Sequence, residues 1–198
     1  DELVAFAHRH DDDKFKASRY FMDGMSAFAK NLYEQAHPTY PITIYYAFKQ
    51  SDTLEDLTSS SGWETFLEAL IDQRLEVVGT WPTRSELSTR VRGLGANALA
   101  SSIVLVCRKR DTEAGTISRR DFQRQLREEM PDALETMIGG QTGQTPIAPV
   151  DLAQSSIGPG MAIYSKYEAV LNQDGSRMSV HDALVLINRA ITEYLSPD

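Results

Sequence analysis

Hydrophobic residues near the start of the chain recur first at helical and then at strand spacing. Apolar residues separated by three, four or seven positions predict a helix over about residues 13–36. This stripe comprises Phe15, Met22, Met25, Phe28, Leu32 and Ala36. The segment "HPTYP" ends the helix. Residues 42–48, "ITIYYAF", are β-branched or aromatic and uncharged, which is typical of a strand buried on both faces in a layered α/β protein.

A further helix and two further strands follow. Ser61 and Glu64 have the spacing of a capping box, and the apolar residues after them give the next helix one hydrophobic face. Residues 75–81 and 98–107 have strand patterns, and the uncharged run "IVLVC" in the second favours a central position. The first connection contains a helix, whereas the last is hairpin-like. We therefore expect strands 42–48 and 75–81 to be parallel, and strand 98–107 to be antiparallel to both.

Beyond Arg110 the pattern predicts helices without strands. Two pairs of polar residues have capping spacing, and each precedes an apolar periodic segment. These pairs are Ser118 with Asp121, and Ser179 with Asp182. Pro131 must kink or restart the first of these helices. We therefore predict that residues 1–112 contain the sheet and that residues 113–198 form a helical extension.

Composition is that of an ordinary globular protein, but one segment is basic. The 198 residues are 41% hydrophobic and 24% charged, with a formal net charge of −8. Residues 80–110, in contrast, carry a local charge of +5. No apolar run approaches the ~20 residues needed to span a bilayer, and the N-terminus lacks a secretory signal pattern, so we expect a cytoplasmic protein. The first residue, Asp1, suggests a piece of a longer protein or a processed terminus.

Few residues have the pattern of a catalytic or metal site. Cys107 lies in an apolar run, which is more typical of a buried structural thiol than of a nucleophile. Residues 8–13, "HRHDDD", contain metal-ligand types, but such a run near a terminus more often forms a solvated segment, and we expect no metal. His37 and His181 are isolated in the sequence. The "GLGAN" at 93–97 is better explained as a turn than as a phosphate loop, because a strand follows where the dinucleotide fingerprint requires a helix.

Four segments resemble one enzyme family. In chain order they are "PITIYYAFKQ", "GWETFLEALIDQRLEVVGTWPTRSE", "RGLGANALASSIVLVCRKR" and "IGPGMAIYSKYEAVL". Together they resemble the C-terminal part of large bacterial and archaeal adenine-specific DNA methylases that carry a conserved N-terminal domain of unknown function. The resemblance runs from about residue 18 to 195, and "TWP", "GANALASSIVLVCR" and "IGPGMA" are its most specific segments.

The resemblance implies an S-adenosylmethionine-dependent class I methyltransferase with a Rossmann-like sheet. Such enzymes hold the cofactor at a Gly-rich loop after the first strand, and they receive the adenine amine at an Asp-Pro-Pro-Tyr or Asn-Pro-Pro-Tyr loop after the fourth. Neither motif occurs in this chain. The chain would therefore supply the fifth, sixth and seventh strands, with the antiparallel seventh between the other two. We expect the full-length protein to bind the cofactor, and this fragment neither to bind it nor to be active alone.

The same resemblance implies a DNA-binding edge. In open α/β sheets ligands gather at the carboxyl ends of the parallel strands, and an adenine methylase must flip its target base into a pocket there. The predicted border of that pocket is Lys49, Gln50 and Trp81. The predicted DNA contacts are Arg84, Arg90 and Arg92, through phosphates, and Asn97, as a hydrogen-bond donor. Alternatively, the arginines form a solvated loop face and Trp81 is a core residue. Arg108, Lys109 and Arg110 lie at the opposite end of the strand and are excluded from the DNA face.

Two functions remain compatible with these residues. The first is the distal half of a DNA adenine methyltransferase, with DNA as its partner. The second is a non-catalytic binding or assembly module of a larger nucleic-acid-modifying protein. In either case the strand at 42–48 carries no Pro, Lys or Asp that would protect an unpaired edge. In the full-length enzyme we expect the rest of the methylase chain to cover that edge. In this chain alone we expect its own N-terminal segment, or a second copy in a homodimer, to cover it.

Overall fold

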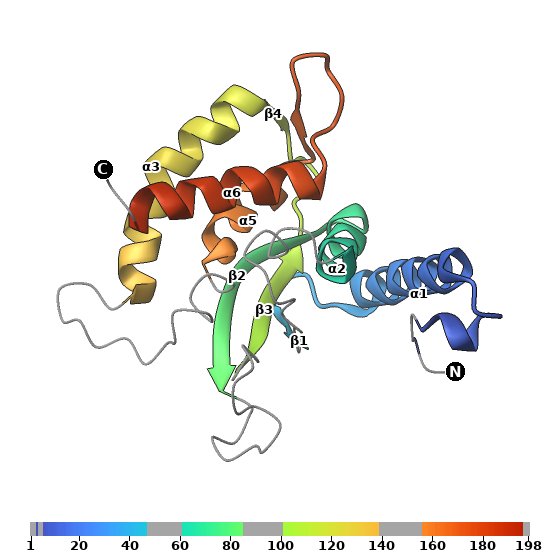
Figure 1. Ribbon diagram of the computed structural model, residues 1–198. Coiled ribbons are helices and arrows are strands. Elements are labelled where there is room, and N and C mark those ends of the chain that lie inside the picture. Colours follow the sequence, from blue (N-terminus) through green and yellow to red (C-terminus); the bar gives the residue numbers. More distant parts are fainter. Residues whose placement is uncertain (1–2, 4–5, 47–60, 85–100, 139–155, 196–198) are drawn as a thin grey trace.

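The computed structural model describes residues 3, 6–46, 61–84, 101–138 and 156–195, which form an α/β fold (Figure 1). The main sheet contains β1 (Ile42–Tyr46), β2 (Leu75–Arg84) and β3 (Ser101–Lys109). The 3-10 turn η1 (Ala7–Arg9), α1 (Lys14–Gln35) and α2 (Ser61–Asp72) belong to the first half of the chain. The second half contains α3 (Arg119–Ile138), α5 (Ile157–Ser165) and α6 (Val180–Leu195).

The strand order of the main sheet is β1-β3-β2, and β3 is antiparallel to both neighbours. Consequently β1 and β2 run in the same direction on either side of β3. This confirms the predicted arrangement, including the central position of the apolar run in β3. The connection lengths and the uncharged character of that run were sufficient to predict the strand order, because a strand between two others presents little surface to water.

Only one face of the main sheet packs against helix α2. The ring of Tyr46 lies 5.0 Å from that of Trp63 and 4.7 Å from that of Phe66, both on α2. On the opposite face, Thr43 and Tyr45 of β1 are exposed. The prediction that strand 42–48 is buried on both faces is therefore wrong for its described residues. β-Branched and aromatic residues are favourable on an exposed strand face too, so their presence alone did not settle burial.

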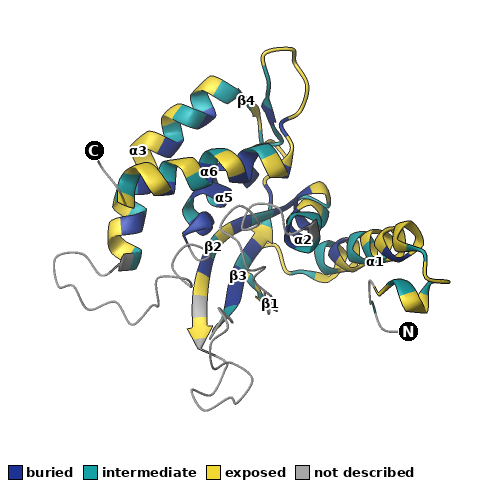
Figure 2. Cartoon of the chain, in the orientation of Figure 1, coloured by how far each residue is buried: buried dark blue, intermediate teal, exposed yellow. Residues whose placement is uncertain are grey.

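Helix α1 has nearly the predicted bounds, but its apolar stripe is only partly covered. Asp13 caps its start, accepting hydrogen bonds from the backbone N–H groups of Phe15 and Lys16. The residues of α1 that are fully buried are Ala17 and Ala29, whereas the Phe15 side chain is 89% exposed. Figure 2 shows α1 extending from α2 with much of its surface exposed. The helical periodicity was a correct signal, although it does not specify what the helix packs against.

Helix α5 lies at the centre of the second half of the chain. Most of its residues are buried, and it packs against β2, α3 and α6. Its Ser165 hydroxyl accepts a hydrogen bond of 2.9 Å from the backbone N–H of Val77, so it covers the outer edge of β2. The hydrophobic core is continuous from α2 and the sheet to α3, α5 and α6. The division of the chain near residue 112 stays a prediction.

The region after Arg110 contains strands, contrary to prediction. β4 (Thr116–Ser118) and β5 (Ala169–Leu171) pair in parallel as a second sheet of two strands. Each strand has three residues, too few to show an alternating pattern. The two segments meet only because the intervening helices fold back, and no local sequence signal indicates that meeting.

The predicted caps of the last long helices are present. The backbone N–H of Asp121 donates to the Ser118 hydroxyl, and that of Asp182 donates to the Ser179 hydroxyl. Pro131 does not end its helix, because α3 runs from Arg119 to Ile138 as one element. The later part of α3 nevertheless turns relative to the first part (Figure 1), as expected where a proline removes one helical hydrogen bond.

Candidate nucleic-acid interface

The described structure contains two of the predicted interface residues, Trp81 and Arg84. Both belong to β2, and Arg84 is its last residue. The other predicted residues lie outside the described residues: Lys49, Gln50, Arg90, Arg92 and Asn97. The structure therefore brings Trp81 and Arg84 onto one strand, and the grouping of the remaining side chains around them stays a prediction.

Trp81 is an exposed residue of the sheet. Its side chain is 54% accessible, and in the register it lies opposite Val104 of β3. The alternative that Trp81 is a core residue is therefore wrong. An indole ring at this exposure presents a large flat surface to a planar partner.

Tyr45 lies on the same row of the sheet and was not among the predicted interface residues. It is opposite Val104 on the other side of β3 and is 71% exposed. Neighbouring strands are about 4.8 Å apart, so Tyr45 and Trp81 flank Val104 with Cα atoms about 10 Å apart. The alternation of Ile42, Thr43, Ile44 and Tyr45 contained the signal, because every second residue could have been assigned to an exposed face.

The row of Tyr45 and Trp81 lies close to the end of the sheet where the stretch with Arg84, Arg90 and Arg92, called the basic segment from here on, begins. The last pair of the β2–β3 register is Arg84 with Ser101, three residues beyond the pair of Trp81 and Val104. At about 3.3 Å per residue, this end is about 10 Å from the row. The arrangement combines flat apolar surfaces with the start of a cationic segment, which is the combination that proteins use to stack bases and hold phosphates.

The cations at the opposite end of β3 contact other parts of the chain. Arg108 donates to the backbone carbonyl of Thr39 at 2.9 Å, and the Lys109 ammonium lies 4.8 Å from the centre of the Tyr33 ring. The guanidinium of Arg110 is buried and donates to the carbonyls of Ser165 and Ile71. The exclusion of Arg108, Lys109 and Arg110 from the predicted DNA face stays a prediction.

The other residues considered as catalytic or metal-binding candidates have structural contacts in the fold. Burial raises the pKa of the Cys107 thiol to about 12, so this side chain stays a neutral core residue at neutral pH. His37 accepts a hydrogen bond from the backbone N–H of Thr39. Asp11 pairs with Lys16, and Asp13 caps α1. Within the described ranges, no group of three or more His, Cys, Asp or Glu side chains could hold a metal ion.

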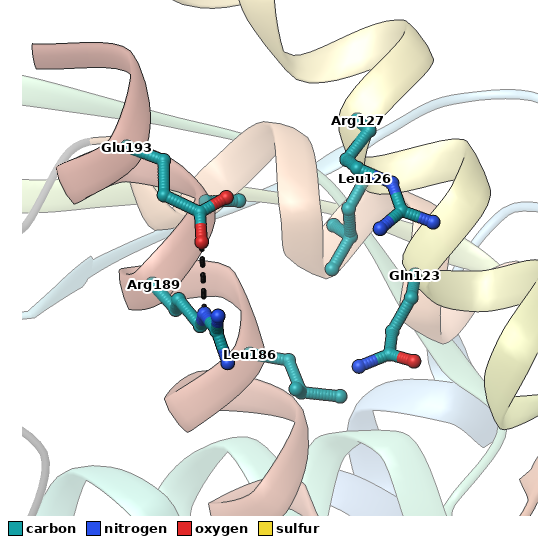
Figure 3. Close-up of a pocket in the computed structure, with 7 residues that line it drawn as sticks. Gln123, Leu126, Arg127, Leu186, Arg189 and Glu193 are labelled. Carbon is teal, nitrogen blue, oxygen red and sulfur yellow. Dashed lines mark hydrogen bonds and ion pairs between the residues drawn. The ribbon is translucent and has the colours of Figure 1, made fainter. Parts of the chain in front are cut away.

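A groove lies between α3 and α6, away from the sheet (Figure 3). It consists of two adjoining hollows of about 140 and 430 Å³. Four residues line both hollows: Leu126, Arg127, Ala190 and Glu193. Arg189 pairs with Glu193 on the α6 wall at 2.8 Å. The sequence does not indicate this groove, because its walls are more than 50 residues apart in the chain.

Comparison with known proteins adds no relative: no family model matches the chain, and neither the curated proteins nor the solved structures give a significant match. Across the residues that the structure describes, no helix is long and apolar enough to cross a membrane.

Proposed function

We propose that this chain is the distal part of the catalytic domain of an S-adenosylmethionine-dependent DNA adenine methyltransferase and contributes a DNA-contacting edge. The observation that carries the proposal is the exposure of Trp81 near the end of β2, where the basic segment follows. The sheet order β1-β3-β2 with an antiparallel central strand supports it, since the resemblance implies that order for the last strands of such an enzyme.

The proposed role of the chain is to hold DNA. The described residues contain no Gly-rich loop after a parallel strand, so we assign no cofactor contact and no methyl-transfer step to them. The cofactor and the catalytic loop belong, in this proposal, to the remainder of the full-length enzyme, and the chain alone is inactive. Arg84, Arg90 and Arg92 contact phosphates, and Trp81 borders the flipped base, with Lys49, Gln50 and Asn97 as further polar contacts.

The proposal is tested by the salt dependence of DNA binding. We expect replacement of Arg84, Arg90 and Arg92 together by Gln to lower the log–log salt slope of affinity by roughly one unit for each lost phosphate contact. Fluorescence anisotropy with a labelled, adenine-containing duplex measures the slope. The control removes the same charge from α1 by Lys16→Gln, Arg19→Gln and Lys30→Gln. An unchanged slope in the first variant would assign the basic segment to solvent.

One observation favours the second candidate, a non-catalytic assembly module. β1 pairs with β3 on one side, and no other described strand pairs with its outer side. Such an edge is a site at which another polypeptide can add a strand. If the chain binds no DNA in the anisotropy experiment, this assembly role replaces the enzymatic proposal.

A further inference from the structure

Helix α3 carries its charges in an order opposed to the helix dipole. Its first nine residues contain four arginines and one acid, whereas residues 128–135 contain four acids and no base. The arginines are Arg119, Arg120, Arg124 and Arg127; the later acids are Glu128, Glu129, Asp132 and Glu135. Anionic side chains are favourable near a helix N-terminus and cations near its C-terminus. In the end turns of α3, Arg119, Arg120 and Glu135 are therefore unfavourably placed for the stability of the helix, whereas Asp121 is favourably placed.

Three of these arginines form one surface, which we call the arginine stripe: Arg120, Arg124 and Arg127. Spacings of four and three residues place them on the same side of the helix, and all three are exposed. Arg124 pairs with Asp121 at 3.0 Å. Arg120 and Arg127 form no hydrogen bond or ion pair with another described residue. Two cations of the stripe are therefore available to an external anion.

The arginine stripe borders the groove between α3 and α6. Arg127 and Gln123 line the groove from α3, and Arg189 lines it from α6 (Figure 3). The amide of Gln123 has no hydrogen bond with another described residue and adds a neutral donor beside the cations. Glu193 also lines the groove and pairs with Arg189 at 2.8 Å, so the groove carries an excess of one positive charge, in a chain whose formal net charge is −8.

We propose that the arginine stripe, with Arg189 and Gln123 beside it, holds successive phosphates of a DNA strand. A helix rises about 1.5 Å per residue, so the Cα atoms of Arg120 and Arg127 are about 10 Å apart along its axis. A DNA strand places one phosphate about every 3.4 Å along the duplex axis. Flexible arginine side chains along this line can therefore reach more than one phosphate. The choice of DNA rests on the proposed function of the chain.

The chemistry of the surface favours a phosphate backbone over an acidic protein. Protein interfaces gain most of their affinity from a few fully desolvated anchors in well-packed pockets, among which Trp, Tyr and Arg are enriched. The described part of α3 exposes no large hydrophobic side chain. Phosphate contacts need only cations and hydrogen-bond donors. The stripe begins beside β4, away from the end of β2, so it forms a second contact surface on the helical part of the chain (Figure 1).

The test compares three triple variants of the chain for affinity to a labelled adenine-containing duplex across a salt series. Arg120→Gln, Arg124→Gln and Arg127→Gln together should lower the log–log salt slope by roughly two to three units. The same positions changed to Lys should retain most of the slope, because lysine holds phosphate as a point charge. Lys16→Gln, Arg19→Gln and Lys30→Gln on α1 form the charge-matched control and should leave the slope near that of the unmodified chain.

A thermal melt separates binding from folding. Of the three arginines, only Arg120 lies in the first turn, where loss of a cation is favourable, and Arg124→Gln removes only an exposed ion pair with Asp121, so we expect a melting temperature close to that of the unmodified chain. If the Gln triple unfolds, the single Arg127→Gln variant decides, and it should lower the slope by about one unit.

The outcomes also separate this inference from the proposed function. A slope lost on changing Arg84, Arg90 and Arg92 but retained in the α3 Gln variants overturns the inference and leaves the function intact. The converse result supports the stripe and removes the role of the basic segment. The inference is overturned in favour of an acidic protein partner if the chain does not bind DNA but binds poly-L-glutamate, and if the α3 Gln variants lose that binding.

Discussion

Gly158 and Gly160 allow α5 to approach two different neighbours closely. A Cβ atom on Gly158 would meet the Thr80 side chain and lie 2.6 Å from the Thr80 backbone nitrogen, so β2 would have to move. A Cβ atom on Gly160 would lie 2.5 Å from Cγ1 of Ile187 on α6, which is fully buried. The specific segment "IGPGMA" therefore has a packing role, since it brings the helix against a strand edge and against another helix.

From this packing we predict that Gly158→Ala and Gly160→Ala each destabilise the chain by about 1–3 kcal/mol, because overfilled contacts force backbone or rotamer shifts. Gly160→Ala should be the milder change, since a side chain rather than a backbone must yield. Chemical denaturation followed by circular dichroism measures the free energy of unfolding of both variants. Gly115→Ala is the control, because a Cβ there meets nothing within 4 Å. Equal stability of all three variants would contradict the packing role.

His181 contributes a pH-dependent contact between helices. Its Nδ1 atom lies 2.8 Å from the Glu64 carboxylate, joining the start of α6 to α2. The hydrogen bond to Glu64 is the main reason that the pKa of His181 is raised above its ordinary value. A raised pKa means that the folded state favours the protonated imidazole. The resulting stabilisation is complete below the unfolded pKa of about 6.5 and is lost as the pH rises through the folded pKa.

We therefore predict that His181→Gln lowers the melting temperature most at pH values below about 6.5, and that its effect shrinks at higher pH. The effect should be small and salt-sensitive, because the imidazole is largely exposed. Thermal melts across a pH series measure it. In a Glu64→Gln background the same substitution should lose most of its pH dependence, since Asp182 is a smaller cause of the raised pKa. If the pH dependence survives without Glu64, the pairing does not cause it.

At the level of elements, the two edges of the main sheet differ. Ser165 of α5 covers the edge at β2 by bonding to the backbone of Val77. The edge at β1 carries the uncharged sequence "ITIYY", and no described strand pairs with its outer side. Unpaired backbone N–H and C=O groups on such a strand favour association with another strand. A homodimer through β1, or pairing with the rest of a longer chain, remains our hypothesis for this edge.

We predict that the chain self-associates with increasing concentration and that Thr43→Lys reduces this association, because an edge lysine opposes strand pairing. Thr43 is exposed, so the substitution should leave the fold intact. Size-exclusion chromatography with light scattering measures the mass. Val185→Lys, at an exposed position of α6, is the matched control. A chain that stays monomeric at the highest concentration, or a Thr43→Lys variant that associates as strongly, would refute the edge hypothesis.

For the whole molecule, patterns within single segments of the sequence predicted the order of the main sheet and the helix caps. The order of the main sheet followed from connection lengths and the uncharged run of β3, and the caps at Ser118 and Ser179 followed from spacing. The exposed face of Tyr45 was not predicted, since aromatic and β-branched residues occur on both faces of strands. The pairing of β4 with β5 was not predictable either, because strands of three residues carry no period.

The candidate surfaces can be recognised only in the folded molecule. The row of Tyr45 and Trp81 depends on the register of both with Val104, which no single segment contains. The arginine stripe can be found from spacing alone, but its exposure depends on which side of α3 packs against α5 and α6. The sequence therefore predicts the elements better than it predicts the surfaces that they leave open.

The hydrogen bond between Ser165 and Val77 also has a consequence for synthesis of the chain. The two residues are 88 positions apart, so the outer edge of β2 cannot be covered until the segment containing α5 has been translated. The sheet is complete only when β3 ends at Lys109, 56 residues before Ser165, and at about 5–20 residues per second this interval lasts roughly 3–11 s on the ribosome. During that time the outer edge of β2 lacks its contact with α5, in addition to the outer side of β1, with which no described strand pairs. Protection of the growing chain by chaperones is therefore most needed between translation of β3 and translation of α5.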